Sequence, residues 1–309
     1  MAYRVTSRSQ SVSSSHQPAL SQNTKTCQTS VTCVYQAHIS GFWRKVTILW
    51  SKNLMNYSLT ISIDHENLVY TSKIDLKPWH FWAKKGFKTL HLDGETHLDA
   101  YWDLRSAKFS TSGPEPTSDY YVALISEDDE IVLLLGDQKK KAYKRAKARP
   151  AIVDPLLFYK KEHVLGKKSF STRARFDRRR RREHEIVVES STSGPREPEM
   201  WISIDGIVLV HVKNLQWKFR GNQTVVVDKQ AVQVYWDVHA WMFCPPGSNH
   251  GLFIFKSGEG EGESEEEEEE DGSSKGDESE CSGNSKYYSI QSYAKCVNFC
   301  LFLYAWKIE

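Results

Sequence analysis

The stretch Leu59-Thr-Ile-Ser-Ile-Asp64 recurs almost unchanged as Met200-Trp-Ile-Ser-Ile-Asp205. In both stretches apolar residues occupy every second position, which is typical of a strand that buries one face. Further landmarks follow each copy in the same order, namely Trp79-x-Phe81 and Tyr101-Trp102-Asp103 after the first and Trp217-x-Phe219 and Tyr235-Trp236-Asp237 after the second. Internal repeats of this kind indicate architecture before any single motif does. We therefore expect two diverged tandem copies of one β unit.

The alternation continues around the two repeated tryptophans. Apolar side chains share one side of each expected strand, at Leu98, Ala100, Trp102 and Leu104 and again at Val232, Val234, Trp236 and Val238. Trp102 and Trp236 are therefore predicted to lie in a core. Each copy contains about seven or eight short strands, which predicts an all-β chain of two β-sandwich or barrel-like repeats.

The expected organisation has four parts. We predict a disordered Ser/Thr-rich N-terminus (1–30), a first β repeat (31–136), a basic helical linker (137–168) and a second β repeat (169–309) with an acidic disordered insertion (257–285). Within the linker, Lys139 to Arg149 has the composition of a helix. Asp137 is the expected N-cap, and Pro150 is expected to end the helix. This helix is predicted to join the two repeats.

Charge is segregated along the chain. The net charge of the whole chain is only +2. Residues 139–182, however, contain 18 Lys and Arg against three acidic residues, a net charge of +15. Residues 259–280 contain 13 acidic residues against one lysine, a net charge of −12. Charge blocks this dense are solvated or form interaction surfaces, because unpaired like charges cannot be buried.

Targeting signals and cysteine pairs are not evident. The N-terminal residues lack the apolar core of a secretory signal, and no apolar run approaches the roughly 20 residues of a membrane span. The six cysteines show neither a CxxC pair nor a metal-ligand spacing. These features predict an intracellular protein, cytoplasmic, nuclear or both, with reduced cysteines.

Several strings resemble a plant family known as domain of unknown function 868. They are Val31-Thr-Cys-Val-Tyr-Gln-Ala-His38, Lys52-Asn-Leu-Met-Asn56, Glu199 to Gly206, Leu215 to Thr224 and Phe299 to Glu309. The resemblance covers roughly residues 30–309. It implies no activity, cofactor or catalytic residue, because the family has none to carry across. The run Arg178 to Arg182 departs from the mixed polar turn expected there.

No catalytic constellation is visible. Gly166-Lys-Lys-Ser169 lacks the earlier glycine of a phosphate-binding loop, and no Gly-x-Ser-x-Gly elbow or Cys/His signature marks a nucleophile. The repeated aspartates Asp103 and Asp237 are better explained by strand ends, and the histidines occur singly. We predict a non-enzymatic protein with no catalytic, cofactor-binding or metal-binding residues.

The basic segment is the best candidate for function. A solvated helix and loop explain it equally well, but it could instead form one basic interaction face. Its candidate residues are Lys139, Lys140, Lys141, Lys144, Arg145, Lys147, Arg149, Arg178, Arg179, Arg180, Arg181 and Arg182. A protein partner ranks first, and nucleic acid or anionic lipid are the other candidates.

Two other classes of function stay open. The chain could be a small-ligand or lipid-binding β-sandwich, or an enzyme whose site is not visible in sequence. A concave site lined by convergent polar groups from both copies would reverse this ranking, in favour of a ligand binder or an enzyme.

Overall fold

The computed structural model describes the chain in eleven segments. These are residues 28–53, 56–65, 68–76, 81–92, 96–110, 113–166, 168–177, 182–191, 197–245, 247–258 and 298–308. Strands make up nearly all of the regular structure, and the described part has two α-helices, α1 (Lys139–Ala146) and α2 (His239–Phe243). The predicted all-β class is confirmed.

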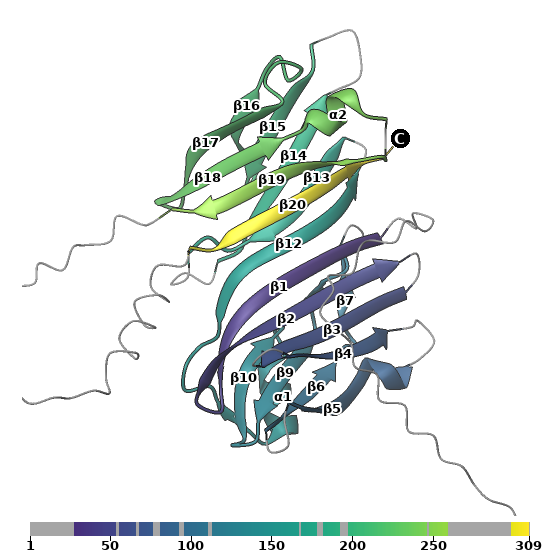
Figure 1. Ribbon diagram of the computed structural model, residues 1–309, viewed down its shortest axis with the longest axis vertical. Helices are drawn as coiled ribbons and strands as arrows, with labels where there is room; N and C mark the ends of the chain where they lie inside the picture. The colour runs from purple at the N-terminus through teal and green to yellow at the C-terminus, as the bar shows by residue number, and fades with distance from the viewer. Residues whose placement is uncertain are drawn as a thin grey trace, which may run out of the picture.

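One nine-stranded sheet runs the length of the molecule and faces the viewer in Figure 1. Its strands, in spatial order, are β17 (Arg220–Val227), β18 (Gln230–Asp237), β19 (His250–Ser257), β20 (Cys300–Lys307), β12 (Leu156–Gly166), β1 (Gln28–Ile39), β2 (Phe42–Asn53), β3 (Asn56–His65) and β4 (Leu68–Leu76).

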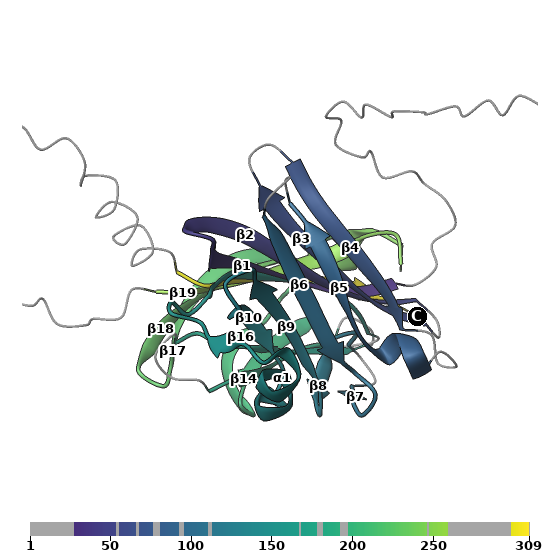
Figure 2. The same cartoon turned by 90° about the horizontal axis from the view of Figure 1, so that it is seen from below.

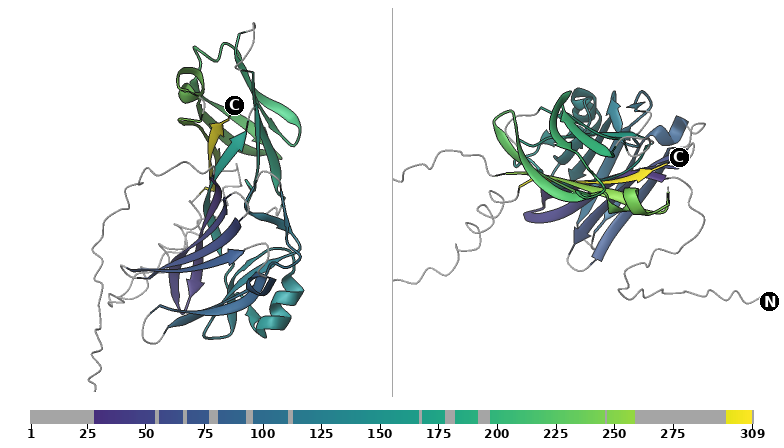
Figure 3. Two further views of the ribbon diagram at one scale, coloured as in Figure 1. Left: turned by 90° about the vertical axis from the view of Figure 1, so that its right-hand side faces the viewer. Right: turned by 90° about the horizontal axis from the view of Figure 1, so that it is seen from above.

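Two smaller sheets pack behind it, both on the same side (Figure 3). The five-stranded sheet has the order β11 (Arg149–Pro150), β10 (Glu130–Leu135), β9 (Tyr121–Ser126), β6 (His97–Asp103) and β5 (Lys85–His91). The four-stranded sheet has the order β13 (Ser169–Ala174), β14 (His184–Ser191), β15 (Glu199–Ile204) and β16 (Ile207–Val212). A 3₁₀ turn, η1 (Phe81–Lys84), and a small hairpin of β7 (Lys108–Phe109) and β8 (Pro116–Ser118) complete the fold.

The two units have the same strand order. Each is a four-stranded meander followed by a second one, β1 to β4 with β5, β6, β9 and β10 in the first unit and β13 to β16 with β17 to β20 in the second. A separate hydrophobic core fills each unit. The shared order supports the repeat hypothesis, which stays a prediction.

Trp102 and Trp236 are buried, as predicted. The indole N–H of Trp102 donates to the carbonyl of Ala83 at 2.9 Å, and that of Trp236 donates to the carbonyl of Lys218 at 3.0 Å. Each ring lies on a glycine of the neighbouring strand, where an added Cβ would approach the ring to 2.8 Å at Gly86 and 2.4 Å at Gly221. Only glycine leaves room for the ring at these positions.

Strand β12 lies within the segment that was expected to be a helical linker, so that prediction is wrong for this part of the chain. It pairs antiparallel with β1 and parallel with β20, so it joins both units into one sheet. Residues 137–168 are therefore only partly helical. The strand was missed because the half-buried Lys160 and the buried Glu162 lie within it, and their charges obscure the apolar alternation of the segment.

The ends of α1 also differ from expectation. The helix ends at Ala146, before Arg149, because Lys147 adopts a left-handed conformation and its N–H bonds the Tyr143 carbonyl. Asp137 does not cap the helix, and instead its carboxylate accepts the backbone N–H of Tyr120 at 3.1 Å. The helix packs on β9 of the first unit, so it does not bridge the two units.

Two boundaries shift relative to the sequence-based ones. Strand β1 begins at Gln28 and so includes residues placed in the N-terminal segment. Ser257, placed in the acidic insertion, completes β19 and is buried, with its hydroxyl donating to the Phe299 carbonyl at 3.2 Å. The rest of the predicted insertion, residues 259–285, and residues 1–27 lie outside the described residues. Asp205 and Gly206 form the hairpin turn between β15 and β16, where both have positive φ, as an Asp-Gly pair favours.

Candidate functional site

The basic helix α1 lies on the five-stranded sheet, on the side away from the nine-stranded sheet (Figure 2). Ala142 is buried, and Tyr143 and Ala146 are partly buried, against a small apolar cluster that includes Tyr121 and Ile131. This apolar stripe fixes the helix and directs its basic side chains outward. All seven predicted basic residues between Lys139 and Arg149 are exposed.

A pocket of about 390 Å³ opens beside α1. Five cationic side chains line it together with two carboxylates, and we call it the cationic pocket. Its lining residues are Lys85, Asp103, Arg105, Ser106, Asp119, Tyr121, Gln138, Lys141, Lys144 and Arg145. Lys141, Lys144 and Arg145 come from one side of the helix, since they are separated by three and four residues.

Both carboxylates of the pocket are already paired. Arg105 donates to Asp103 through Nη2 at 2.8 Å and Nε at 3.0 Å. Burial alone would raise the pKa of Asp103, but the hydrogen bonds from Arg105 outweigh it and hold that pKa below its ordinary value. Lys108 lies 2.9 Å from Asp119 and lowers the pKa of that carboxyl through their hydrogen bond.

The helix cations of the pocket are different. Within the described residues, no carboxylate lies within ion-pair distance of Lys141, Lys144 or Arg145. Three unpaired cations and two paired ones therefore converge on one concave site. Such a site attracts anions, because clustered charge of one sign raises the local concentration of the opposite sign.

The other predicted basic residues lie elsewhere. Lys139 and Lys140 of α1, and Lys147 directly after the helix, are exposed but do not line the pocket. Arg149 forms an ion pair with Glu130 at 3.3 Å. Residues 178–181, all arginines, fall outside the described residues.

Arg182 corrects the idea of a single basic face. Its guanidinium lies 3.1 Å from Asp205 and 3.0 Å from Asp228, both in the second unit. His184 also contacts Asp205, with Nδ1 at 2.9 Å. Arg182 therefore holds turns of its own unit together. Sequence could not show this, because its acidic partners are 23 and 46 residues away.

Sequence reasoning missed two members of the cationic pocket. Lys85 begins β5, and Arg105 follows the end of β6. Neither belongs to a charge run, and they meet α1 only because β6 pairs with β9, the strand on which the helix packs. No local signal in the sequence identifies them.

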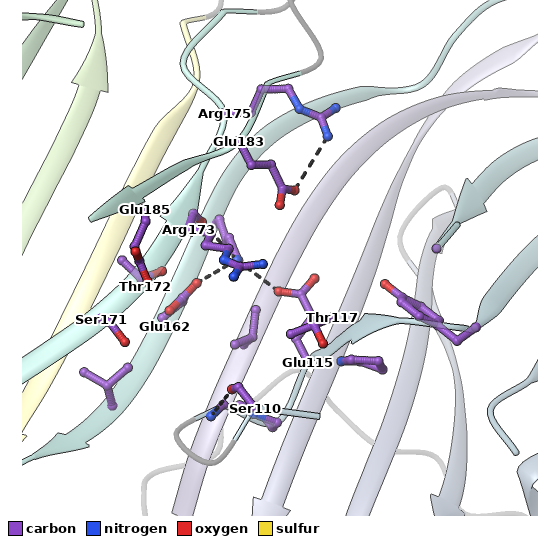
Figure 4. Close-up of a pocket in the computed structure, with 18 of the residues that line it drawn as sticks. Ser110, Glu115, Thr117, Glu162, Ser171, Thr172, Arg173, Arg175, Glu183 and Glu185 are labelled. Atoms are coloured by element: carbon purple, nitrogen blue, oxygen red, sulfur yellow. Dashed lines mark hydrogen bonds and ion pairs between the residues drawn. The ribbon is translucent and has the colours of Figure 1, made fainter. Parts of the chain in front are cut away.

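A second concave site lies between the two units (Figure 4). This inter-unit cleft has a volume of about 390 Å³. Strand β12 forms its floor, the β7–β8 hairpin one wall, and β13 and β14 the other. Polar residues of both units therefore converge on it, which is the arrangement that favours the ligand-binding alternative.

Lys160 binds the two walls of the cleft together. Its ammonium lies 2.7 Å from Glu162 and 3.0 Å from Glu115, and it donates to the backbone carbonyl of Arg173 at 3.2 Å. Burial alone would lower the pKa of Lys160, but the two carboxylates raise it well above its ordinary value. Its three N–H donors therefore meet three acceptors, one from each wall and one from the floor.

Thr172 leaves the cleft with an unsatisfied polar atom. The residue is 7% exposed and lines the cleft, and its hydroxyl has no hydrogen-bond partner among the residues that the structure describes. Arg175 and Glu183 form an ion pair at 3.6 Å near one end of the cleft (Figure 4).

Metal-binding and membrane-spanning features were also sought. Across the described ranges, no group of three or more His, Cys, Asp and Glu side chains could hold a metal ion. Neither α1 nor α2 has the length and apolar character needed to cross a bilayer. Cys33, Cys244 and Cys300 are free thiols, and burial raises the pKa of the Cys33 thiol.

Comparison with known proteins gives one match. No curated protein and no solved structure matches the chain. A family model described as a plant protein of unknown function (DUF868) matches residues 26–307, which covers both units and the strand that joins them. The chain therefore belongs to this plant family.

Proposed function

We propose that this chain is a non-enzymatic binding protein that engages an anionic group of a protein partner in the cationic pocket. The observation that carries the proposal is the convergence of Lys141, Lys144 and Arg145, none with a carboxylate partner among the described residues, beside Lys85 and Arg105. Five donors around one cavity suit a phosphate or carboxylate, since charge-assisted hydrogen bonds to such groups are strong.

The shape of the site favours a protein partner over an extended polyanion. The cations enclose a pocket, whereas a strand of RNA or a lipid surface would contact the exposed side of α1 as a whole. A phosphorylated or acidic side chain presented by a partner fits into a pocket of this size. Nucleic acid and anionic lipid are therefore the competing outcomes of the test.

The test compares two triple variants of the same helix. Lys141→Glu with Lys144→Glu and Arg145→Glu reverses the pocket cations, while Lys139→Glu with Lys140→Glu and Lys147→Glu makes the same charge change at exposed positions outside the pocket. The pocket variant should bind a phosphoserine peptide about tenfold or more weakly, because each lost charged hydrogen bond contributes roughly 1.5–3 kcal/mol. The control variant should bind nearly as the wild type does.

Two probes separate the alternatives. Labelled poly(U) RNA and phosphatidylserine vesicles report on the other partner classes, and their binding should fall steeply with salt if they are the true ligands. Equal loss in both triple variants, or tight binding of RNA alone, contradicts the proposal.

The inter-unit cleft supports a second candidate, the ligand-binding β protein, which ranks below the cationic pocket because Lys160 of the cleft is already paired with Glu115 and Glu162. Its support is the convergence of polar groups from both units and the hydroxyl of Thr172, for which the described part of the chain offers no hydrogen-bond partner. An intracellular location stays part of the proposal and is tested by microscopy of the tagged full chain.

The repeat hypothesis is also kept as a proposal. The equivalent tryptophan hydrogen bonds, the equivalent Trp–Gly contacts and the common strand order support descent of the two units from one ancestor.

A further inference from the structure

Strand β13 is an edge strand that borders the inter-unit cleft. Among the described strands it pairs with β14 alone, at the end of the four-stranded sheet. The backbone groups on its other side therefore have no strand partner. Ser171, Thr172 and Arg173 of this strand line the cleft, and Ser171 and Arg173 are exposed there.

The register of the sheet shows which groups these are. The backbone N–H of Ser190 donates to the Lys168 carbonyl at 2.9 Å, so these two residues are directly opposite and hydrogen-bonded. In an antiparallel pair hydrogen-bonded positions alternate with non-bonded ones. Thr172 and Ile186 therefore bond to each other, while Ser171 and Arg173 direct their N–H and C=O groups away from β14.

Two further contacts support this direction. Lys160 donates to the Arg173 carbonyl from the cleft side of β13, at 3.2 Å. The backbone of Glu185, which is opposite Arg173, bonds instead toward β15, through the N–H of Asp205 at 2.9 Å. The N–H and C=O of Ser171 and the N–H of Arg173 thus open into the cleft.

We propose that this edge of β13 binds an extended peptide segment of a partner protein as an added strand. A peptide residue opposite Ser171 would exchange two backbone hydrogen bonds with it, and a further carbonyl would accept the N–H of Arg173. Strand addition of this kind derives affinity from the main chain and specificity from alternate side chains. This site is separate from the cationic pocket.

The surroundings indicate the preferred side chains. No carboxylate lies within ion-pair distance of the Arg173 guanidinium among the described residues, whereas Arg175 is paired with Glu183. An acidic residue of the peptide beside Arg173 would complete a cross-strand charge pair. The peptide side chains that point the other way would face Lys160 and Glu162 of β12, on the floor of the cleft, where small side chains fit.

The probe is a fluorescein-labelled, amidated peptide of three Thr-Glu repeats, measured by fluorescence polarisation with the full chain. Two modified probes carry N-methyl groups on the threonines only or on the glutamates only. Because alternate residues direct their N–H groups to the same side of a strand, only one of the two modified peptides should lose binding. A merely electrostatic contact would tolerate both modifications.

The matched protein variants are Ser171→Pro and Ser171→Ala. Proline removes the outward N–H and places its ring there, yet an edge position leaves the β13–β14 bonds intact. Ser171→Pro should weaken probe binding about tenfold or more, consistent with lost hydrogen bonds of roughly 0.5–1.5 kcal/mol each and a steric block. Ser171→Ala should bind as the wild type does, and thermal denaturation of both variants checks the fold.

One control separates this proposal from the proposed function. An acidic probe could also bind the cationic pocket, so the experiment is repeated in the Lys141→Glu, Lys144→Glu, Arg145→Glu variant, where the Ser171→Pro effect should persist. The proposal is overturned if both N-methylated peptides bind like the parent, if Ser171→Pro binds normally, or if the parent shows no binding at about 1 mM, the weak limit of a specific contact. None of these results bears on the phosphopeptide test.

Discussion

At the scale of single residues, the aromatic face of β12 and its neighbours shows how burial sets protonation. His163 lies between the rings of Tyr304 and Trp306, at centroid distances of 5.1 Å from each. Burial, helped by the charges of Lys161 and His250, lowers the pKa of His163 from 6.5 to about 4. Between pH 6.5 and about 4, the imidazole is therefore mostly neutral in the folded protein and mostly protonated in the unfolded chain.

This shift predicts a pH dependence of stability. The contribution of His163 is complete above pH 6.5 and is lost as the pH falls toward about 4, because the unfolded state binds the proton first. His163→Gln should therefore lose less free energy of unfolding than the wild type between these pH values. Urea denaturation at several pH values measures this, with His91→Gln at an exposed position of β5 as the matched control. Identical pH profiles for wild type and His163→Gln would contradict the prediction.

At the scale of elements, β12 has a dual role. Its outward residues extend the nine-stranded sheet, and its inward residues Lys160 and Glu162 carry charge into the junction between units. A buried ion pair contributes little net stability by itself, but removal of one partner leaves an uncompensated charge. Lys160 therefore serves chiefly to link Glu115, in the β7–β8 hairpin, to the backbone of strand β13.

Lys160→Met tests this role. It should destabilise the protein by about 3–5 kcal/mol, because Glu162 would remain buried without its cation. Adding Glu115→Gln and Glu162→Gln to Lys160→Met should recover much of the loss, since no uncompensated charge is then left. Equilibrium unfolding in urea measures both variants. If Lys160→Met is as stable as the wild type, the two walls of the cleft do not depend on this cluster.

At the scale of the whole molecule, charge and architecture are partly independent. The cationic pocket lies on the back of the first unit and the cleft lies between the units, so the two proposed sites can be tested separately. The acidic run, residues 259–280, comes between β19 and β20, and both strands end in well-defined hydrogen bonds. Deletion of this run therefore tests whether it contributes to the stability of the fold.

Replacement of residues 259–285 by a short Gly/Ser linker should leave the Tm nearly unchanged. A segment of glycine and like charges buries too little apolar surface to repay its ordering entropy. The same deletion should strengthen binding of the phosphoserine peptide to the cationic pocket, because it removes a block of net charge −12 from a chain of net charge +2. Calorimetry and polarisation measure the two effects. A fall in Tm of more than about 4 °C, which corresponds to roughly 1–2 kcal/mol for a large domain, would refute the first expectation.

The sequence by itself determined the all-β class, the positions of most strands and the burial of Trp102 and Trp236. It could do so because the alternation of apolar residues is local, and a strand of a two-layered protein must place one side in the core. The turn at Asp205-Gly206 was predictable for the same reason, because the preference of an Asp-Gly pair for positive φ depends on these two residues alone. The basic character of α1 was likewise evident from adjacent residues.

Only the tertiary structure decided which charges meet. Arg182 forms ion pairs with Asp205 and Asp228. Lys85 and Arg105 instead line one pocket together with residues of α1. The spacing of these residues in the sequence predicts neither arrangement. Strand β12 was hidden because its buried charges are acceptable only once Glu115 and the Arg173 carbonyl are folded against Lys160. The open edge of β13 likewise depends on sheet order. Such features depend on contacts between residues that are far apart in sequence. These contacts stabilise the protein only after the intervening loops have closed, which costs entropy.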